Sequence, residues 1–193
     1  GNDLGATMPG YFNCLPCSPG FSGDGTQSAC SPCEGGTYAD NSAQAVCTPC
    51  GPGTNSTVQG ATSNTTCTKC PLGRYSPSPG SRECTACPPG TFCNEYGLFK
   101  YEECAVGRYN DVKSQLNCTV CPPGRYQSDG GAAKCTECKP GKFNNKTGSE
   151  SSADCSNCQA GKYAPQEGSG TCLLCGKDTF TAQSGNNTKC IKC

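Results

Sequence analysis

Large apolar side chains stand singly along this chain, and small or polar residues fill the segments between them. Eight aromatic residues each lie five positions after a cysteine: Tyr38, Tyr75, Phe92, Tyr109, Tyr126, Phe143, Tyr163 and Phe180. Phe21 lies four positions after Cys17, so its unit is one residue shorter. One ring per unit of about seventeen residues is far too little to form a self-sufficient core. The pattern therefore predicts a tandem repeat array and not a chain folded around one hydrophobic core.

Each unit begins with the motif Cys-x-x-Gly-x-(Phe/Tyr), followed by seven to eleven polar residues. Examples are Cys70-Pro-Leu-Gly-Arg-Tyr75 and Cys121-Pro-Pro-Gly-Arg-Tyr126. The Pro-Gly step predicts a tight turn, because proline fixes φ and glycine accepts a positive φ. We expect each ring to pack on its own disulfide and on the neighbouring unit. The alternative is a row of exposed rings that stack on sugars or on a partner.

Cysteine makes up 22 of the 193 residues and falls almost entirely into Cys-x-x-Cys pairs. The pairs begin at Cys14, Cys30, Cys47, Cys67, Cys84, Cys118, Cys135, Cys155, Cys172 and Cys190, which leaves Cys93 and Cys104 outside the pattern. A crosslink around roughly fifteen residues contributes about 3 kcal/mol by the loop-closure argument. The composition thus indicates small units held together by disulfides.

Such a density of disulfides requires an oxidising compartment. Five glycosylation sequons agree with an extracellular glycoprotein, secreted or attached to the cell surface, and they begin at Asn55, Asn64, Asn117, Asn145 and Asn186. Asn55 also occupies the aromatic position of its unit, where a glycan could replace the ring. Basic and acidic residues number 15 each and no basic run exists, which argues against nucleic acid and anionic membranes as partners. No signal peptide or membrane-spanning stretch is visible, so we expect mature protein or an excised segment, with no direct membrane insertion.

A longer period is superimposed on the short one. The segments 30–87 and 118–175 match without a gap at an offset of 88 residues, including all eight cysteines of each copy. We therefore divide the chain into a partial unit with a first repeat, a first super-repeat, an irregular joint, a second super-repeat and a last unit. Their limits are 1–29, 30–87, 88–117, 118–175 and 176–193.

The joint contains the densest aromatic and charged stretch of the chain, residues 94–103. We interpret it as a hairpin that covers a bend between the super-repeats. The alternative is a lateral contact with a partner molecule, made by Tyr96, Leu98, Phe99 and Tyr101.

The simplest disulfide connectivity links the second cysteine of each pair to the first of the next, although sequence alone does not decide it. The pairs would be Cys17–Cys30, Cys33–Cys47, Cys50–Cys67, Cys70–Cys84, Cys104–Cys118, Cys121–Cys135, Cys138–Cys155, Cys158–Cys172 and Cys175–Cys190. Cys87–Cys93 follows for the irregular unit. Cys14 and Cys193 remain near opposite ends of an extended chain. They are candidates for an intermolecular disulfide between head-to-tail subunits, or they pair with flanking units of a longer repeat protein.

Two Cys-x-x-Cys pairs can also form a zinc site, and Cys47-Thr-Pro-Cys50-Gly-Pro-Gly53 partly resembles the zinc knuckle of chaperones. The following pairs lack that motif, and zinc thiolates need a reducing compartment that the sequons contradict. A redox-active pair would be a single site, not a periodic series. Histidine is absent and no nucleophile elbow or phosphate loop occurs. We expect no catalytic residues, no metal, no cofactor and no enzymatic activity.

The unit Cys-x-x-Cys-Pro-Pro-Gly-x-(Tyr/Phe) resembles the ephrin-receptor-like cysteine-rich repeat, and its loop is similar to the simplest module of tumour-necrosis-factor-receptor cysteine-rich domains. The resemblance covers essentially residues 8–193. It implies small disulfide-rich repeats, that is, short two-stranded β-hairpins stacked into an elongated rod with almost no helix, and the connectivity given above. Departures occur at Asn55, at the Cys93 insertion and at Cys175-Gly-Lys-Asp178, where the Pro-Gly step is lost.

Such modules serve as receptor ectodomains, spacers and structural filaments, so the fold does not define the function. Similar repeats occur in mastigoneme-type filament proteins. We expect an extracellular structural glycoprotein whose rods self-associate head to tail into a filament or surface coat. The alternatives are the ligand-binding ectodomain of a cell-surface receptor and a cysteine-rich surface antigen of a protist.

Overall fold

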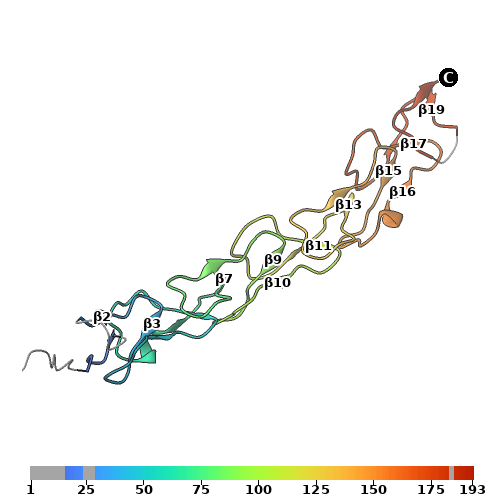
Figure 1. The fold of residues 1–193 in the computed structure, drawn as a ribbon. Coiled ribbons are helices and arrows are strands. Elements are labelled where there is room, and N and C mark those ends of the chain that lie inside the picture. Colours follow the sequence, from blue (N-terminus) through green and yellow to red (C-terminus); the bar gives the residue numbers. More distant parts are fainter. Residues whose placement is uncertain (1–15, 24–28, 183–184) are drawn as a thin grey trace, which may run out of the picture.

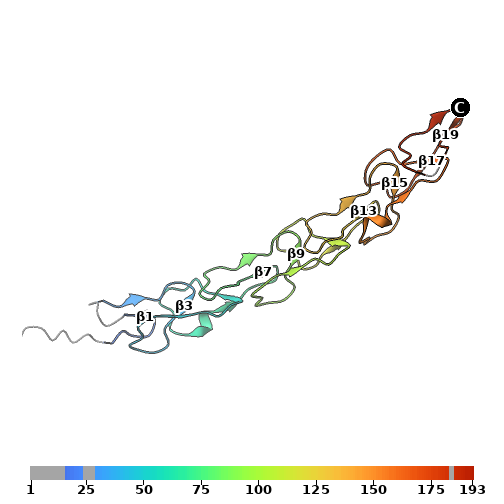
Figure 2. The same cartoon turned by 45° about the vertical axis from the view of Figure 1, so that its right-hand side comes forward.

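The computed structural model describes residues 16–23, 29–182 and 185–193. These residues form a long, gently curved rod, with the earliest described segments toward one tip and the C-terminus at the other (Figure 1). A second view of the rod shows the same extended shape (Figure 2). The prediction of an elongated rod of short hairpins with almost no helix is confirmed.

Ten two-stranded antiparallel hairpins follow one another along the rod, and each strand is two residues long. The first five hairpins are β1–β2 (Phe21–Ser22, Ser31–Pro32), β3–β4 (Thr37–Tyr38, Thr48–Pro49), β5–β6 (Thr54–Asn55, Thr68–Lys69), β7–β8 (Arg74–Tyr75, Thr85–Ala86) and β9–β10 (Thr91–Phe92, Glu102–Glu103). The other five are β11–β12 (Arg108–Tyr109, Thr119–Val120), β13–β14 (Arg125–Tyr126, Thr136–Glu137), β15–β16 (Lys142–Phe143, Ser156–Asn157), β17–β18 (Lys162–Tyr163, Leu173–Leu174) and β19–β20 (Thr179–Phe180, Ile191–Lys192).

Two 3₁₀ turns are the only helical elements of the described residues: η1 (Asn64–Thr66) and η2 (Ser152–Asp154). The turn η1 lies in the disulfide loop Cys50–Cys67 and η2 lies in the loop Cys138–Cys155. These are the two longest disulfide loops, each with a sequence separation of 17. Ser63 and Ser151 cap the two turns through their side chains, and Ser151 with Asp154 forms a capping box. None of the described helices has the length or the apolar character needed to span a bilayer.

The structure brings together all ten cysteine pairs that the simplest connectivity links. The buried apolar residues of the described chain are cysteines and three alanines, Ala39, Ala61 and Ala164. The rings of the repeating motif lie on the first strand of their hairpins and are half-buried, apart from the exposed Phe21 and Phe180. The rod therefore has a narrow core of sulfur and backbone, with the rings over it and not inside it.

Candidate assembly interface

Neighbouring units are joined by a repeating set of backbone hydrogen bonds. We define a unit as the segment from its opening cysteine to the residue three positions before the next opening cysteine, and name it by those limits. Between the 121–135 and 138–155 units, the amide of Gly124 donates to the carbonyl of Asn144 at 2.7 Å. The Gln127 amide donates to the Ser149 carbonyl at 2.9 Å, and the Gly148 amide donates back to the Cys121 carbonyl at 2.7 Å. We call these bonds the inter-unit ladder.

The ladder runs along the whole described rod. The carbonyl of the opening cysteine accepts a hydrogen bond from the turn of the next unit at Cys17, Cys33, Cys50, Cys70, Cys87, Cys104, Cys121, Cys138 and Cys158. All of these bonds join backbone groups, so they do not depend on which side chains the polar loops carry. The same backbone bonds thus recur at every contact between described units.

A second contact reaches the unit after next. A Cβ atom built on Gly124, whose φ is +84°, would lie 1.9 Å from the carbonyl oxygen of Gly168. Real Cβ atoms do not approach backbone this closely, so the glycine of the turn is required twice, once for its positive φ and once for space. Each unit is therefore held by its neighbours on both sides and by the units beyond them, which stiffens the rod.

The residue six positions after the opening cysteine lies at the centre of the ladder, and we call it the inner position. It is at most 8% exposed in every unit from 33–47 onward, and it holds Ala39, Ser56, Ser76, Cys93, Asn110, Gln127, Asn144, Ala164 and Thr181. The side-chain amide of Asn110 donates to the Thr91 carbonyl at 2.7 Å. Within the described residues, no buried side-chain nitrogen or oxygen lacks a hydrogen-bond partner.

The inner position cannot be recognised from residue type in the sequence, because its residues share no chemical type. Small apolar, hydroxyl, amide and thiol side chains all occur there, and what they share is burial against backbone. The sequence feature by which they could have been found is their constant spacing of six residues from the opening cysteine. Cys93 occupies this position in its unit, which explains why a cysteine outside the pairing pattern is fully buried.

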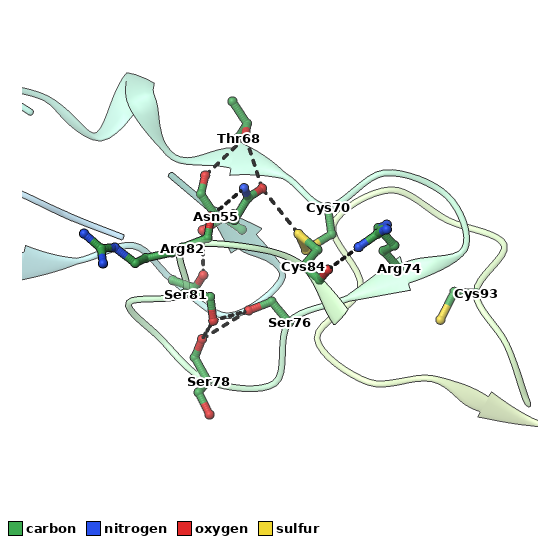
Figure 3. The surroundings of a disulfide bond; sticks show 12 residues. Asn55, Thr68, Cys70, Arg74, Ser76, Ser78, Ser81, Arg82, Cys84 and Cys93 are labelled. Carbon is green, nitrogen blue, oxygen red and sulfur yellow. Dashed lines mark hydrogen bonds between the residues drawn. A yellow bond between two sulfur atoms is a disulfide. The ribbon is translucent and has the colours of Figure 1, made fainter. Parts of the chain in front are cut away.

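Asn55 takes the place of the ring in the 50–67 unit and is bound into the structure at its amide (Figure 3). Its Nδ2 donates to the Arg82 carbonyl at 3.1 Å, and its Oδ1 accepts from the Thr68 hydroxyl at 3.2 Å. The Sγ atom of Cys84 lies 3.3 Å from the same Oδ1. The side chain thus connects its own hairpin to the disulfide of the next unit, the place expected for a ring.

The other four sequon asparagines, Asn64, Asn117, Asn145 and Asn186, are all exposed. Asn55 is half-buried, and the nitrogen that would carry a glycan already donates to a neighbouring unit. A glycan at the four exposed sites would project from the rod, whereas one at Asn55 would require this hydrogen bond to be given up.

The joint continues the ladder without interruption. The Cys93 carbonyl accepts from Gly73 and its amide donates to the Gln115 carbonyl, at 2.9 and 3.0 Å. Tyr101 packs edge-on against the ring of Tyr75, with 5.2 Å between centroids. The predicted hairpin corresponds to β9–β10, and that it covers a bend between the super-repeats stays a prediction.

The four residues considered for a lateral contact differ in their exposure. Tyr96 and Phe99 are 65% and 54% exposed, and the Lys100 ammonium lies 6.0 Å from the Phe99 ring centroid. Leu98 is half-buried, and its carbonyl accepts from the Ser76 amide at 3.0 Å. Tyr101 is partly covered by Tyr75. Tyr96 and Phe99 are therefore the rings of the joint that are open to a partner.

At the C-terminal tip, Cys193 has a free and exposed thiol. Its amide donates to the Asp178 carbonyl at 3.0 Å, as the amides of the internal opening cysteines donate to the turn glycine before them. Cys193 is thus placed like the first residue of a further unit. Cys14, its suggested intermolecular partner, lies outside the described residues.

The described residues contain no group of three or more cysteine or carboxylate side chains arranged to hold a metal ion. The two ion pairs of the described chain are on its surface: Arg125–Glu137 at 2.5 Å across β13 and β14, and Arg82–Glu34 at 3.8 Å between units. Exposed pairs of this kind contribute little to stability.

The repeating ladder and the disulfide pairing agree with the family comparison. The model of the family described as tyrosine-protein kinase ephrin type A/B receptor-like matches residues 20–67, 61–104, 107–155 and 150–190. The chain belongs to the ephrin-receptor-like repeat family. The first three matches each contain two complete hairpins, and the fourth contains β17–β18 with single strands of the hairpins beside it, so the family repeat is a group of stacked units. No curated protein matches the chain. Together, the repeat type and the ten disulfides make this an extracellular or cell-surface domain.

Proposed function

We propose that this chain is a non-enzymatic structural glycoprotein, a stiff extracellular rod that joins end to end into a filament or surface coat. The observation that carries the proposal is the inter-unit ladder, because it repeats the same backbone hydrogen bonds from unit to unit. A rod built in this way can be extended by a further unit of the same kind.

The C-terminal unit offers the groups that such an extension would use. The amide of Cys193 donates to the Asp178 carbonyl of this unit at 3.0 Å, as an opening cysteine does in the units before it. The Cys193 thiol lies at the same tip. We propose that a second copy docks here and that Cys193 pairs with its Cys14, which encloses a loop of ordinary length for this chain.

Electron microscopy and non-reducing electrophoresis of the native glycoprotein test the proposal. We expect fibres with an axial repeat of one rod length, and a ladder of multimers that collapses on reduction. Cys193→Ser and Cys14→Ser should each abolish the multimer ladder, while Ser114→Ala, a change remote from both tips, should leave it intact. Dispersed rods and a single monomer band would refute end-to-end assembly.

A second candidate function is ligand binding by a receptor-type ectodomain, favoured by the exposed rings of Tyr96 and Phe99. Exposed aromatic side chains of this kind are common anchors of protein interfaces. If this function holds, the double variant Tyr96→Ser/Phe99→Ser should lose binding to the ligand or to the cell surface. Val46→Ser changes a 78% exposed side chain elsewhere on the rod, so it is the control and should bind like the parent chain.

Glycan mapping by mass spectrometry tests the glycoprotein part of the proposal. We expect glycans at Asn64, Asn117, Asn145 and Asn186, and the lowest occupancy at Asn55, whose amide nitrogen is engaged. Full occupancy at Asn55 would show that the half-buried arrangement does not restrict modification.

A further inference from the structure

One of the glycosylation sequons overlaps a disulfide bond. In Asn117-Cys118-Thr119, the middle residue is the cysteine that closes the 104–118 unit through its bond to Cys104. None of the other four sequons contains a cysteine. Cys104 is 1% exposed, so the bond ties the middle of this sequon to the narrow core of the rod.

Hydrogen bonds hold the same segment in the folded unit. Thr119, the hydroxyl residue of the sequon, lies in β12 opposite Tyr109 of β11. The carbonyl of Cys118 accepts a hydrogen bond from the Arg108 guanidinium at 3.0 Å. Asn117 itself is exposed. The side chain that would carry the glycan is therefore open to solvent, while the two residues after it are fixed to the rod.

The sequon Asn145-Lys146-Thr147 has the opposite surroundings. It begins seven residues after Cys138 and ends eight residues before Cys155, in the middle of their disulfide loop. Among the hydrogen bonds of the described residues it uses one group, the Lys146 amide, which donates to the Asn144 side chain at 3.0 Å. A segment held by few hydrogen bonds opens transiently, whereas a disulfide opens only by exchange with a thiolate.

We propose that Asn117 accepts a glycan only before the Cys104–Cys118 bond forms, so that the redox state of the compartment sets how many copies carry it. The proposal rests on the glycoprotein part of the proposed function and adds the regulation of one of its sites. The modifying enzyme must reach both the asparagine amide and the hydroxyl two residues later. Once Cys118 is crosslinked, this segment cannot be drawn away from the rod into an enzyme cleft.

Two reactions compete for the segment. In glycosylation, Nδ2 of Asn117 releases a proton and bonds to C1 of a sugar, and the bond from that C1 to a lipid pyrophosphate donor breaks. In crosslinking, the thiols of Cys104 and Cys118 lose two protons and two electrons to a disulfide oxidant, which becomes a dithiol. Because Asn117 is exposed, a glycan leaves the later disulfide possible. The disulfide, in contrast, excludes a later glycan.

The order of synthesis makes this competition close at Asn117. Cys104 precedes Cys118 by 14 residues, so the partner thiol is already present when the sequon emerges. At about 5–20 residues per second this lead is about one to three seconds, and disulfides form within seconds to hours. At Asn145 the sequon emerges before the closing Cys155, so glycosylation has the first opportunity. We therefore expect partial occupancy at Asn117.

Glycopeptide mapping of the full chain, secreted from eukaryotic cells, tests the proposal. In the parent chain we expect the occupancy at Asn117 to lie below that at Asn145. Cys104→Ala leaves the sequon unchanged and should raise the occupancy at Asn117 to the level of Asn145. Cys121→Ala/Cys135→Ala is the matched control. It removes a crosslink of the same separation, 14, from a loop without a sequon, and should leave Asn117 as in the parent.

A second measurement uses the unaltered chain. Dithiothreitol added to the cells during synthesis delays the Cys104–Cys118 bond, so it should raise the occupancy at Asn117 and leave that at Asn145 unchanged. After the reductant is removed, non-reducing peptide mapping should find the Cys104–Cys118 bond in the copies that carry the Asn117 glycan. Its absence from those copies would show that the glycan and the bond exclude each other in either order, against the proposal.

The outcomes separate this inference from the proposed function. The inference is overturned if Asn117 has the same occupancy in the parent and in Cys104→Ala, whether full or empty. It is also overturned if the control raises the occupancy as much as Cys104→Ala does. In each case a glycan at Asn145 leaves the glycoprotein proposal standing. If no sequon carries a glycan in any of these chains, the glycoprotein proposal fails and this inference with it.

Discussion

The hairpin β7–β8 and the hairpin that follows it, β9–β10, have the same backbone but different crosslinks. In the first, Cys70 pairs with Cys84 at a separation of 14. In the second, Cys87 pairs with Cys93 at a separation of 6. Tyr101 stands where a closing cysteine is expected, three residues before Cys104. Both hairpins have the same two-residue pairing and the same ladder bonds to their neighbours.

The comparison shows that the position of the disulfide does not define the hairpin. The ladder is unchanged where the closing cysteine is replaced, and the Tyr101 ring packs on Tyr75 instead. The backbone contacts determine how units stack. The crosslinks instead lower the conformational entropy of the unfolded chain, and their position within a unit can change. Four changes to the sequence test this division of roles.

The largest effect should come from closing the space at a turn glycine. We expect Gly124→Ala to destabilise its units by at least about 3 kcal/mol, since a left-handed alanine costs 1–2 kcal/mol and the Gly168 backbone must also move. Gly161→Ala is the matched control. Its φ is +75°, but no described atom lies within 4 Å of an added Cβ, so it should cost only about 1–2 kcal/mol. Hydrogen exchange of the amides in 121–172 measures the loss of stability in each variant. Equal losses in the two variants would show that the close approach to Gly168 is unimportant.

Removing a crosslink should weaken the regular unit more than the irregular one. Loop closure gives about 3 kcal/mol for the Cys70→Ala/Cys84→Ala pair and about 2.4 kcal/mol for Cys87→Ala/Cys93→Ala. If the ladder holds the hairpin, the β9–β10 amides remain protected from exchange in the second variant, at a lower opening free energy. Complete loss of their protection would mean that the relocated disulfide is needed to form the hairpin.

The irregular unit should accept the regular crosslink. In the variant Cys93→Ser/Tyr101→Cys, Cys87 can pair with the new cysteine at the usual separation of 14, and serine at the inner position matches Ser76. We expect a change in stability within about 1 kcal/mol, because the lost ring contact of 0.5–1.5 kcal/mol is offset by the longer loop. Non-reducing peptide mapping identifies the new pair. A free Cys87 would contradict the equivalence of the two units.

The smallest effect is expected where the ladder turn lacks its glycine. Ala43 and Ser114 have φ values of 62° and 64° at a position that is glycine in most units. Replacing either by glycine removes left-handed strain and adds chain entropy, for a net gain of about 0.5–1 kcal/mol. Thermal or chemical denaturation of the non-reduced protein compares each variant with the parent. A loss of stability would show that the side chains contribute contacts that outweigh the strain.

The sequence allowed the crosslinks and the repeat to be predicted because both depend on spacing. A cysteine at the start of each unit and a ring five residues later mark the units even where the loops differ in length. The inner position could not be found in the same way, since alanine, serine, asparagine and threonine satisfy the same need for a small or hydrogen-bonded buried side chain. Asn55 was read as a ring replaced by a glycan site, and its role as a bridge to Arg82 became visible only in three dimensions.

The sequence by itself determined the class of the protein: its compartment, its repeating unit and the family to which it belongs. These follow from local patterns of cysteine, glycine and aromatic residues. Only the tertiary structure decided how units stack, because the ladder is made by backbone groups that every residue carries and that leave no mark in the sequence.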